Sequence, residues 1–254
     1  MTPQDAAQLL FNEANQGRRY PLDAAALSLD AGYQAQLALI QLFLDAGETQ
    51  GGWKIGFTAP AVRERFGATA PVFGYLLDRT ALASGGTQSL AGLTNPCLES
   101  ELCFEFGSTL PSSGVTAELV RESLSAVIPA FELIDLCANP KEHPGLNVAD
   151  NVMHVSWVLG APLRPYPKAL DLGSVQAAIN RDGELFQQHL GRDVIDNQLE
   201  SLAWLANAVG RFGGRIEAGH KVLTGSFGAP IPVKSGEHFE TEFSDIGNVS
   251  VQFT

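Results

Sequence analysis

Two glutamates at alternate positions of one segment are the first residues of this sequence suited to chemistry. Glu99 and Glu101 lie in residues 98–106, where apolar residues alternate with them in a pattern that predicts a β-strand. Because side chains alternate between the two faces of a strand, both carboxylates share one face, about 7 Å apart. They repel each other unless solvent or a cation lies between them. The pair therefore indicates either a hydrated acidic face on a half-exposed strand or part of a metal site.

A third glutamate, Glu132, lies in the nearly unbroken apolar run of residues 126–134. In a strand its neighbours on the same face are apolar, so its carboxylate points toward the interior or into a cleft. An unpaired ionised carboxylate there costs on the order of several kcal/mol, which protonation, a basic partner or a metal would relieve. With the first pair it forms an all-oxygen set suited to Mg²⁺ or Mn²⁺. A salt bridge between Glu132 and a lysine is the alternative.

Lys54 is a basic residue in apolar surroundings. It stands between Trp53 and Ile55 in residues 53–57, which alternate like a strand. A lysine there either extends along the apolar surface to reach solvent or lies beside carboxylates in a site. Beside a centre of metal and carboxylates, its amine can donate or accept a proton.

The elements that position these residues are predicted from periodicity and from glycine, proline and capping signals. Helices are expected from Thr2-Pro3 onward and over residues 30–45, 60–67, 116–125 and 197–212. Strands are expected over residues 53–57, 98–106, 126–136, 154–159, 175–180, 184–189, 221–227 and 248–253. Residues 181–184 predict a hairpin turn, because Gly183 readily adopts the positive φ angle that such turns require. The chain is expected to be an α+β protein, with a small helical N-terminal portion over residues 1–75 and a sheet-rich body over residues 76–254.

Composition and charge exclude several classes of protein. The chain has 254 residues, 45% hydrophobic and 17% charged, which argues against a disordered chain or a coiled coil. With 16 basic against 28 acidic residues, the net charge of −12 disfavours nucleic acid or an anionic membrane as a partner. We find no secretory signal pattern and no apolar stretch near the N-terminus that approaches a membrane span of about 20 residues. Cys97, Cys103 and Cys137 are odd in number and lack metal spacing, so we expect reduced thiols and a cytoplasmic protein.

Six short motifs occur in one order along the chain. They read GWKIGFT, PVFG, ESE, PAFE, VADN and LTGS, at residues 52–58, 71–74, 99–101, 129–132, 148–151 and 223–226. In order and spacing they resemble the hydratase/decarboxylase branch of the fumarylacetoacetate hydrolase superfamily. The resemblance covers nearly the whole chain. Any one motif is a weak signal, whereas six in order are specific.

The resemblance implies both a fold and a set of functional residues. The body is expected to be a mixed β-roll of the fumarylacetoacetase C-terminal type, and the protein a homo-oligomer. Glu99, Glu101 and Glu132 are implied to bind Mg²⁺ or Mn²⁺, and Lys54 to lie in the active site as a catalytic residue. A turn of three residues is implied to help form the pocket for a small 2-oxo acid: Thr224, Gly225 and Ser226.

The function that the resemblance implies is that of a metal-dependent lyase. The favoured reaction is the addition of water to 2-hydroxypenta-2,4-dienoate or a related 2-oxo or 2-hydroxy-dienoic acid, in aromatic meta-cleavage catabolism. A decarboxylase of the 4-oxalocrotonate type would use the same metal residues and is the alternative. A non-catalytic partner subunit, or a complex with a related decarboxylase or hydratase, is a second alternative. Motifs of serine hydrolases and nucleotide-binding proteins are absent.

The chain departs from the family pattern after Asn151. Family members usually carry small residues there, whereas this chain has Val152, Met153 and His154. If this stretch lines the pocket, Met153 and His154 narrow it, and His154 adds a titratable group that contacts substrate. The alternative is that His154 is hydrogen-bonded within the body of the protein.

Overall fold

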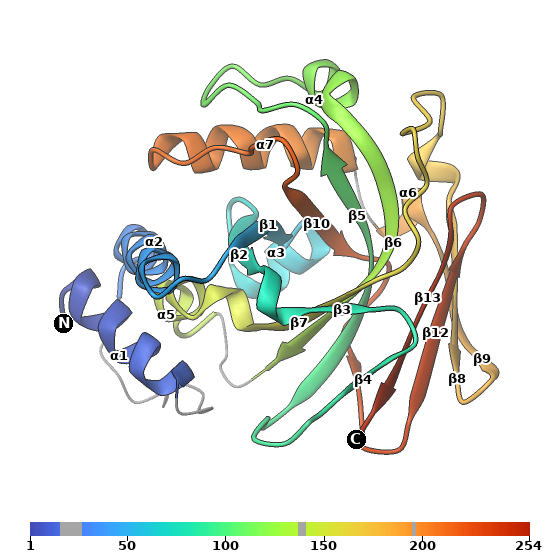
Figure 1. The fold of residues 1–254 in the computed structure, drawn as a ribbon, viewed down its shortest axis with the longest axis horizontal. Coiled ribbons are helices and arrows are strands. Elements are labelled where there is room, and N and C mark those ends of the chain that lie inside the picture. Colours follow the sequence, from blue (N-terminus) through green and yellow to red (C-terminus); the bar gives the residue numbers. More distant parts are fainter. Residues whose placement is uncertain (16–26, 137–140, 195–196) are drawn as a thin grey trace.

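The computed structural model describes residues 1–15, 27–136, 141–194 and 197–254. Within them the chain forms two β-sheets with helices mostly on one side (Figure 1). The larger sheet has the order β2-β1-β10-β5-β6-β7-β3, with β11 paired to β5. Its strands are β1 (Gln50–Gly56), β2 (Val72–Leu77), β3 (Ala81–Ala83), β5 (Pro96–Phe106), β6 (Leu124–Asp135), β7 (His154–Leu159), β10 (Lys221–Ser226) and β11 (Ile231–Pro232).

The smaller sheet has the order β4-β13-β12-β8-β9 and lies against the long strands β5 and β6 (Figure 1). Its strands are β4 (Gly86–Gln88), β8 (Gln176–Arg181), β9 (Glu184–Leu190), β12 (His238–Phe243) and β13 (Gly247–Phe253). Buried aromatic rings pack along this sheet, with Phe227 and Phe243 edge to face at 5.3 Å. The hydroxyls of Ser100 on β5 and Thr241 on β12 lie 2.9 Å apart, so a buried hydrogen bond also joins the two sheets.

Several helices begin at residues with capping side chains. Ser28, Thr116 and Asn197 each accept hydrogen bonds from the first-turn backbone of the helix that follows. The helices are α1 (Pro3–Asn15), α2 (Leu29–Asp45), α3 (Pro60–Phe66), α4 (Ala117–Ser123), α5 (Pro144–Ala149), α6 (Gly191–Val194) and α7 (Gln198–Arg211). Three short 3₁₀ turns are η1 (Asp78–Thr80), η2 (Asn151–Met153) and η3 (Leu172–Ser174).

The predicted α+β class is confirmed, and each helix and strand predicted from the sequence corresponds to an element of the structure. The hairpin turn between β8 and β9 has Asp182 and Gly183 at φ angles of 53° and 84°. Strand β2 spans the predicted boundary near residue 75 and pairs with β1 in the larger sheet. The larger sheet is therefore continuous across that boundary, and the division into two portions stays a prediction. Cys97 and Cys103 are buried free thiols, whereas Cys137 lies outside the described residues.

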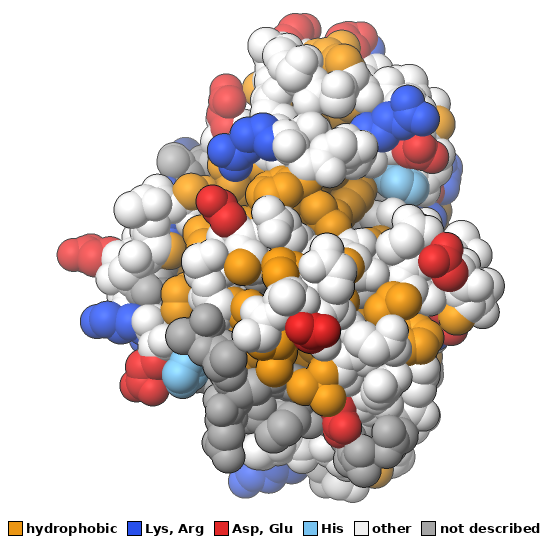
Figure 2. All heavy atoms as spheres, turned by 90° about the vertical axis from the view of Figure 1, so that its left-hand side faces the viewer, with side chains coloured by type: hydrophobic (Ala, Val, Ile, Leu, Met, Phe, Trp, Pro, Cys, Tyr) orange, Lys and Arg blue, Asp and Glu red, His pale blue; other side chains and the backbone are white. Residues whose placement is uncertain are grey.

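The helical side of the molecule carries a mixed surface. Figure 2 shows hydrophobic side chains across the middle of this face, with acidic and basic side chains interspersed around them. Among the residues that the structure describes, no helix combines the length and the apolar character needed to cross a membrane.

Helices α2 and α5 approach each other backbone to backbone. A Cβ atom on Gly32 would lie 2.3 Å from the carbonyl oxygen of Gly145, so only glycine fits there. The buried Gln36 amide donates to the carbonyls of Phe73 and Val148, at 2.9 and 2.8 Å. These contacts fix α5, which leads directly into the η2 turn.

We expect Gly32→Ala to lower the free energy of unfolding by about 1–3 kcal/mol, because the new methyl group overlaps the α5 backbone. Helix propensity alone predicts the opposite, a gain of about 1 kcal/mol. Urea denaturation followed by circular dichroism measures the change. Gln34→Ala, on the exposed face of α2, is the control and should change stability by less than about 0.5 kcal/mol. Stabilisation by Gly32→Ala would contradict the close approach.

Candidate active site

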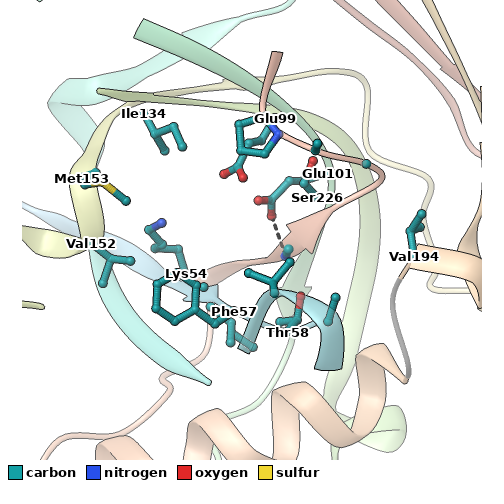
Figure 3. Close-up of a pocket in the computed structure, with 18 of the residues that line it drawn as sticks. Lys54, Phe57, Thr58, Glu99, Glu101, Ile134, Val152, Met153, Val194 and Ser226 are labelled. Atoms are coloured by element: carbon teal, nitrogen blue, oxygen red, sulfur yellow. Dashed lines mark hydrogen bonds between the residues drawn. The ribbon is translucent and has the colours of Figure 1, made fainter. Parts of the chain in front are cut away.

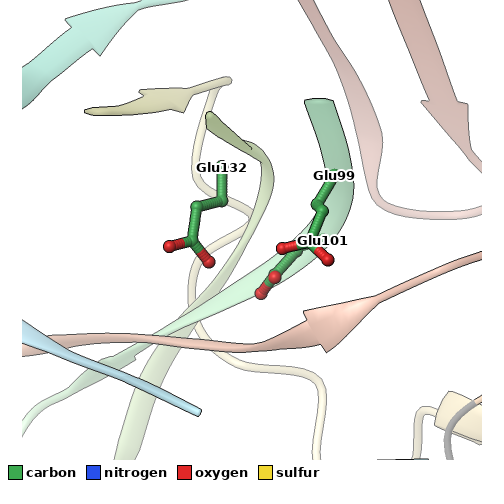
Figure 4. A group of neighbouring side chains, drawn as sticks. All are labelled: Glu99, Glu101 and Glu132. Carbon is green, nitrogen blue, oxygen red and sulfur yellow. The ribbon is translucent and has the colours of Figure 1, made fainter. Parts of the chain in front are cut away.

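Strand register brings the three glutamates together. Strands β5 and β6 are antiparallel, with Glu99 directly opposite Glu132 and Glu101 opposite Ala130. Residues opposite each other in an antiparallel pair share a face, so all three carboxylates project on the same side of the sheet. One carboxylate oxygen from each lies within 4.8 Å of those of the other two (Figure 4). Glu101 and Glu132 are buried, and Glu99 is partly exposed.

Lys54 reaches this cluster from β1, across β10 and β5. Its Nζ atom lies 2.9 Å from Oε1 of Glu132, and both side chains are at least 97% buried. The salt bridge that was the alternative for Glu132 is therefore present together with the three-carboxylate cluster. Nδ1 of His154 lies 2.8 Å from the same oxygen. Because an ionised carboxylate only accepts hydrogen bonds, Nδ1 of His154 must carry the proton.

Burial and mutual repulsion control the ionisation of the cluster. Burial, followed by the charge of Glu132, raises the pKa of Glu99 to about 7. The same two causes raise the pKa of Glu101 well above its usual value. Burial also opposes ionisation of Glu132, but the Lys54 ammonium and the His154 hydrogen bond outweigh it and lower the pKa of Glu132. Although burial opposes its charge, Glu132 and Glu99 raise the pKa of Lys54. Lys54 and Glu132 therefore form a charged pair.

The residues fit a divalent cation. The three carboxylates offer only oxygen ligands, which Mg²⁺ and Mn²⁺ prefer. Oε2 of Glu132 is buried and has no hydrogen-bond partner among the described residues, so a cation would satisfy it. Lys54 balances one of the three carboxylates, and a divalent cation would balance the other two. Among the acidic, histidine and cysteine residues that the structure describes, Glu99, Glu101 and Glu132 are the group that lies close enough together to hold a metal ion.

An irregularity in β10 carries the predicted substrate turn. The register with β5 shifts between Leu223 and Ser226. Gly225 sits in this bulge at a φ of 102°, and a Cβ there would lie 2.2 Å from Oγ1 of Thr58. Its N–H donates to Oε2 of Glu101 at 2.8 Å. Gly225 and Ser226 line the cavity, whereas Thr224 is fully buried and donates to the Leu102 carbonyl.

The cluster lies at one end of a cavity of about 530 Å³. Figure 3 shows Lys54, Glu99 and Glu101 pointing into it, with Val152 and Met153 across from the two glutamates. Sequence reasoning had not identified the other apolar lining residues, because they come from segments far apart in the chain. They include Phe57, Val62, Ile134, Leu136 and Val194.

The η2 turn places the residues that depart from the family pattern. Asn151, Val152 and Met153 adopt φ angles of 56°, 54° and 62°, three consecutive residues in the left-handed region. Val152 and Met153 face the cavity, as expected if this stretch lines the pocket. The structure places His154 differently from the expected substrate contact. His154 is not among the described residues that line this cavity and instead contacts Glu132, as the alternative interpretation had it.

We expect Lys54→Met to lower the free energy of unfolding of the metal-free protein by about 3–5 kcal/mol, because it leaves Glu132 buried without its ionic partner. Urea denaturation in the presence of a chelator measures the loss. Lys221→Met is the matched control, since Lys221 is half-buried and its Nζ lies 3.8 Å from Glu105. Its loss should stay below about 1 kcal/mol. Equal losses in the two variants would contradict a special role for the Lys54–Glu132 pair.

No protein-family model matches the sequence. Curated relatives do match. The chain is 32% identical to 2-hydroxyhexa-2,4-dienoate hydratase of Comamonas testosteroni, over 90% of this chain and 87% of that protein. It is 31% identical to 2-keto-4-pentenoate hydratase of Paraburkholderia xenovorans, over 100% of this chain and 96% of the relative.

A solved structure is similar over nearly the whole chain. It is 4-oxalocrotonate decarboxylase from Pseudomonas putida G7, complexed with magnesium and adipate. It matches with a TM-score of 0.91 and 25% identity, over 99% of this chain and 97% of that chain. The predicted resemblance is confirmed by relatives more than 30% identical over most of their length. The chain belongs to the hydratase/decarboxylase branch of the fumarylacetoacetate hydrolase superfamily.

Proposed function

We propose that the protein is a hydro-lyase that requires a divalent metal and adds water to 2-hydroxypenta-2,4-dienoate or a closely related dienoic acid. The reaction belongs to the breakdown of aromatic compounds after ring cleavage. The observation that carries the proposal is the cluster of Glu99, Glu101 and Glu132, with Lys54 beside it, at one end of the cavity. Relatives named as hydratases over the length of the chain support it.

Glu99, Glu101 and Glu132 are the proposed ligands of the cation. When bound, a divalent cation supplies Lewis-acid polarisation of the C1 carboxylate and the C2 oxygen of a 2-oxo acid. The protein's own contacts fix the ligands in advance. The Gly225 N–H holds Glu101, and His154 holds Glu132 at the oxygen that Lys54 also contacts. We therefore propose that His154 positions a ligand, rather than touching the substrate.

Lys54 is the proposed proton carrier. Its amine is protonated, buried and directed into the cavity beside the carboxylates. We propose that the Lys54 ammonium delivers a proton to C5 of the dienol and that its amine takes up the proton released by the enol oxygen, which restores the ammonium and forms the 2-oxo-3-enoate. Water then adds at C4 and a proton at C3, so that one water molecule is consumed in total. The surrounding apolar side chains limit access of other water molecules to the reacting carbons.

Two further properties rest on the family and on the donor set. The similarity to 4-oxalocrotonate decarboxylase keeps decarboxylation as a second candidate reaction, because one set of metal ligands can stabilise an enolate in either reaction. A non-catalytic partner subunit is the remaining alternative.

Mg²⁺ or Mn²⁺ is the proposed ion, and the homo-oligomeric state and the complex with a related enzyme stay predictions. Gly225 and Ser226 are proposed to contact substrate, whereas Thr224 holds β10 against β5.

We expect Glu101→Gln to lower kcat/KM for 2-hydroxypenta-2,4-dienoate by at least about 100-fold and to weaken Mn²⁺ binding, because a ligand charge is lost. Loss of dienol absorbance measures turnover, and titration calorimetry with Mn²⁺ measures metal binding. Glu105→Gln is the matched control. It lies on the same strand but pairs with Arg164 outside the cavity, so both readouts should stay near wild type. Full Mn²⁺ affinity in Glu101→Gln would refute the ligand assignment.

Removal of the metal tests the dependence directly, and the products separate the candidate reactions. We expect chelator-treated protein to lose turnover, because the cation that would polarise the substrate's C1 and C2 oxygens has been removed. Adding Mg²⁺ or Mn²⁺ should restore turnover. A hydratase forms 4-hydroxy-2-oxopentanoate without carbon dioxide, which chromatography detects. Release of carbon dioxide from 4-oxalocrotonate instead would favour the decarboxylase. Tight metal binding without turnover of either substrate would favour the partner subunit.

A further inference from the structure

The two ends of the cavity differ in chemistry. The inner end carries Lys54 and the glutamates, whereas the wall across from Glu99 and Glu101 is formed by Val152 and Met153 (Figure 3). Val152 and Met153 are no more than 5% exposed. Ile134 and Leu136 pack with Met153 and continue this wall, whereas Phe57 and Val194 add apolar surface elsewhere in the cavity lining (Figure 3). A substrate anchored by its C1 and C2 oxygens at the inner end therefore extends its tail along apolar surface.

Few charges face that tail. Beyond the inner cluster, the described lining residues that can carry charge are Arg65, His189 and Asp193. Arg65 and Asp193 are exposed and of opposite sign, so together they add no net positive charge. Nε2 of His189 lies 3.2 Å from the Gln187 side-chain oxygen. A second carboxylate on the substrate would lose its hydration here without gaining a buried basic partner.

The wall is held in place by strained backbone. Val152 is β-branched, and such residues rarely adopt the left-handed conformation that it has here. The Asn151 side chain fixes the turn, because it accepts from the Tyr75 N–H at 2.8 Å and donates to the Tyr75 carbonyl at 2.9 Å. Strained residues persist where surrounding contacts impose them, and they are common at ligand-binding sites. The strain here serves to direct two consecutive apolar side chains into the cavity.

We propose that this wall selects the substrate by its tail, with Met153 as the specificity-determining residue. The site takes 2-hydroxy-2,4-dienoates that end in an uncharged vinyl or alkyl group, and it discriminates against those that end in a second carboxylate. This inference rests on the proposed function, because it takes the inner end of the cavity as the anchor for the 2-oxo acid.

Two substrates of equal chain length test the inference in the wild-type protein. We expect kcat/KM for 2-hydroxyhexa-2,4-dienoate to exceed that for 2-hydroxyhexa-2,4-dienedioate by at least about 100-fold. A parallel binding experiment uses 2-oxohexanoate and 2-oxohexanedioate, which differ in the same way, in titration calorimetry with Mg²⁺ present. We expect the monoacid to bind at least about tenfold more tightly. Equal or tighter binding of the diacid would overturn the inference.

Variants at Met153 assign the effect to the wall. Met153→Arg should reduce the monoacid-to-diacid ratio at least about tenfold, since the guanidinium offers the distal carboxylate a partner. Met153→Leu keeps the wall apolar and should leave the ratio within about threefold of wild type. An unchanged ratio in folded Met153→Arg, checked by thermal unfolding, would remove Met153 from the assignment. If that variant does not fold, Leu136→Arg, on the same apolar wall, gives the same test.

The two proposals fail in different ways. If no dienoate is turned over but the monoacid still binds more tightly in calorimetry, the proposed lyase activity is refuted and the proposed selection of ligands by their tail is retained. Turnover with a diacid preference would refute the tail selection alone. If Arg65→Gln then abolished that preference, the distal carboxylate would be assigned to Arg65.

Discussion

A single buried ion pair underlies the site. Three carboxylates converge within 4.8 Å, and such an arrangement is unfavourable unless positive charge compensates it. The Lys54 ammonium, 2.9 Å from Glu132, supplies one charge permanently. Burial and mutual repulsion raise the pKa of the other two carboxylates, Glu99 and Glu101, and a divalent cation would compensate the charge of both. The larger sheet allows Lys54 and Glu132 to pair, because it brings β1 and β6 within reach of each other across β10 and β5.

The same scaffold gives the cavity two unlike ends. Side chains of β1, β5 and β6 form the ionic end, whereas the η2 turn, Ile134 of β6 and loop residues form the apolar end. The ionic end can serve every member of a branch that processes 2-oxo acids, because all such substrates share their C1 and C2 oxygens. In the proposed function, the apolar end faces the part of the substrate beyond C2. In the proposed function, anchoring and selection are therefore carried by different side chains.

The sequence predicted the cluster because strand periodicity is simple. Positions 99, 101 and 132 each lie in clear strand patterns, and burial of Glu132 follows from its apolar neighbours. The register of Glu99 against Glu132 is a long-range pairing that no local pattern contains. Thr224 was expected in the pocket, but the bulge in β10 changes which side chains face the cavity. The left-handed turn at Val152 runs against the preference of a β-branched residue, so propensity could not have indicated where His154 points.

Two hydrogen bonds between Asn151 and Tyr75 connect the wall of Val152 and Met153 to the N-terminal helices. The Tyr75 ring packs 6.4 Å from the ring of Phe43 in α2, and the Asn151 side chain hydrogen-bonds to both the N–H and the carbonyl of Tyr75. The orientation of the wall is thereby coupled to the packing of the N-terminal helices. If the wall selects the substrate as proposed, changes under α2 that move Tyr75 would alter this selection without replacing any residue that lines the cavity. Libraries for new substrate preferences can therefore include these helix positions as well as the cavity-lining residues.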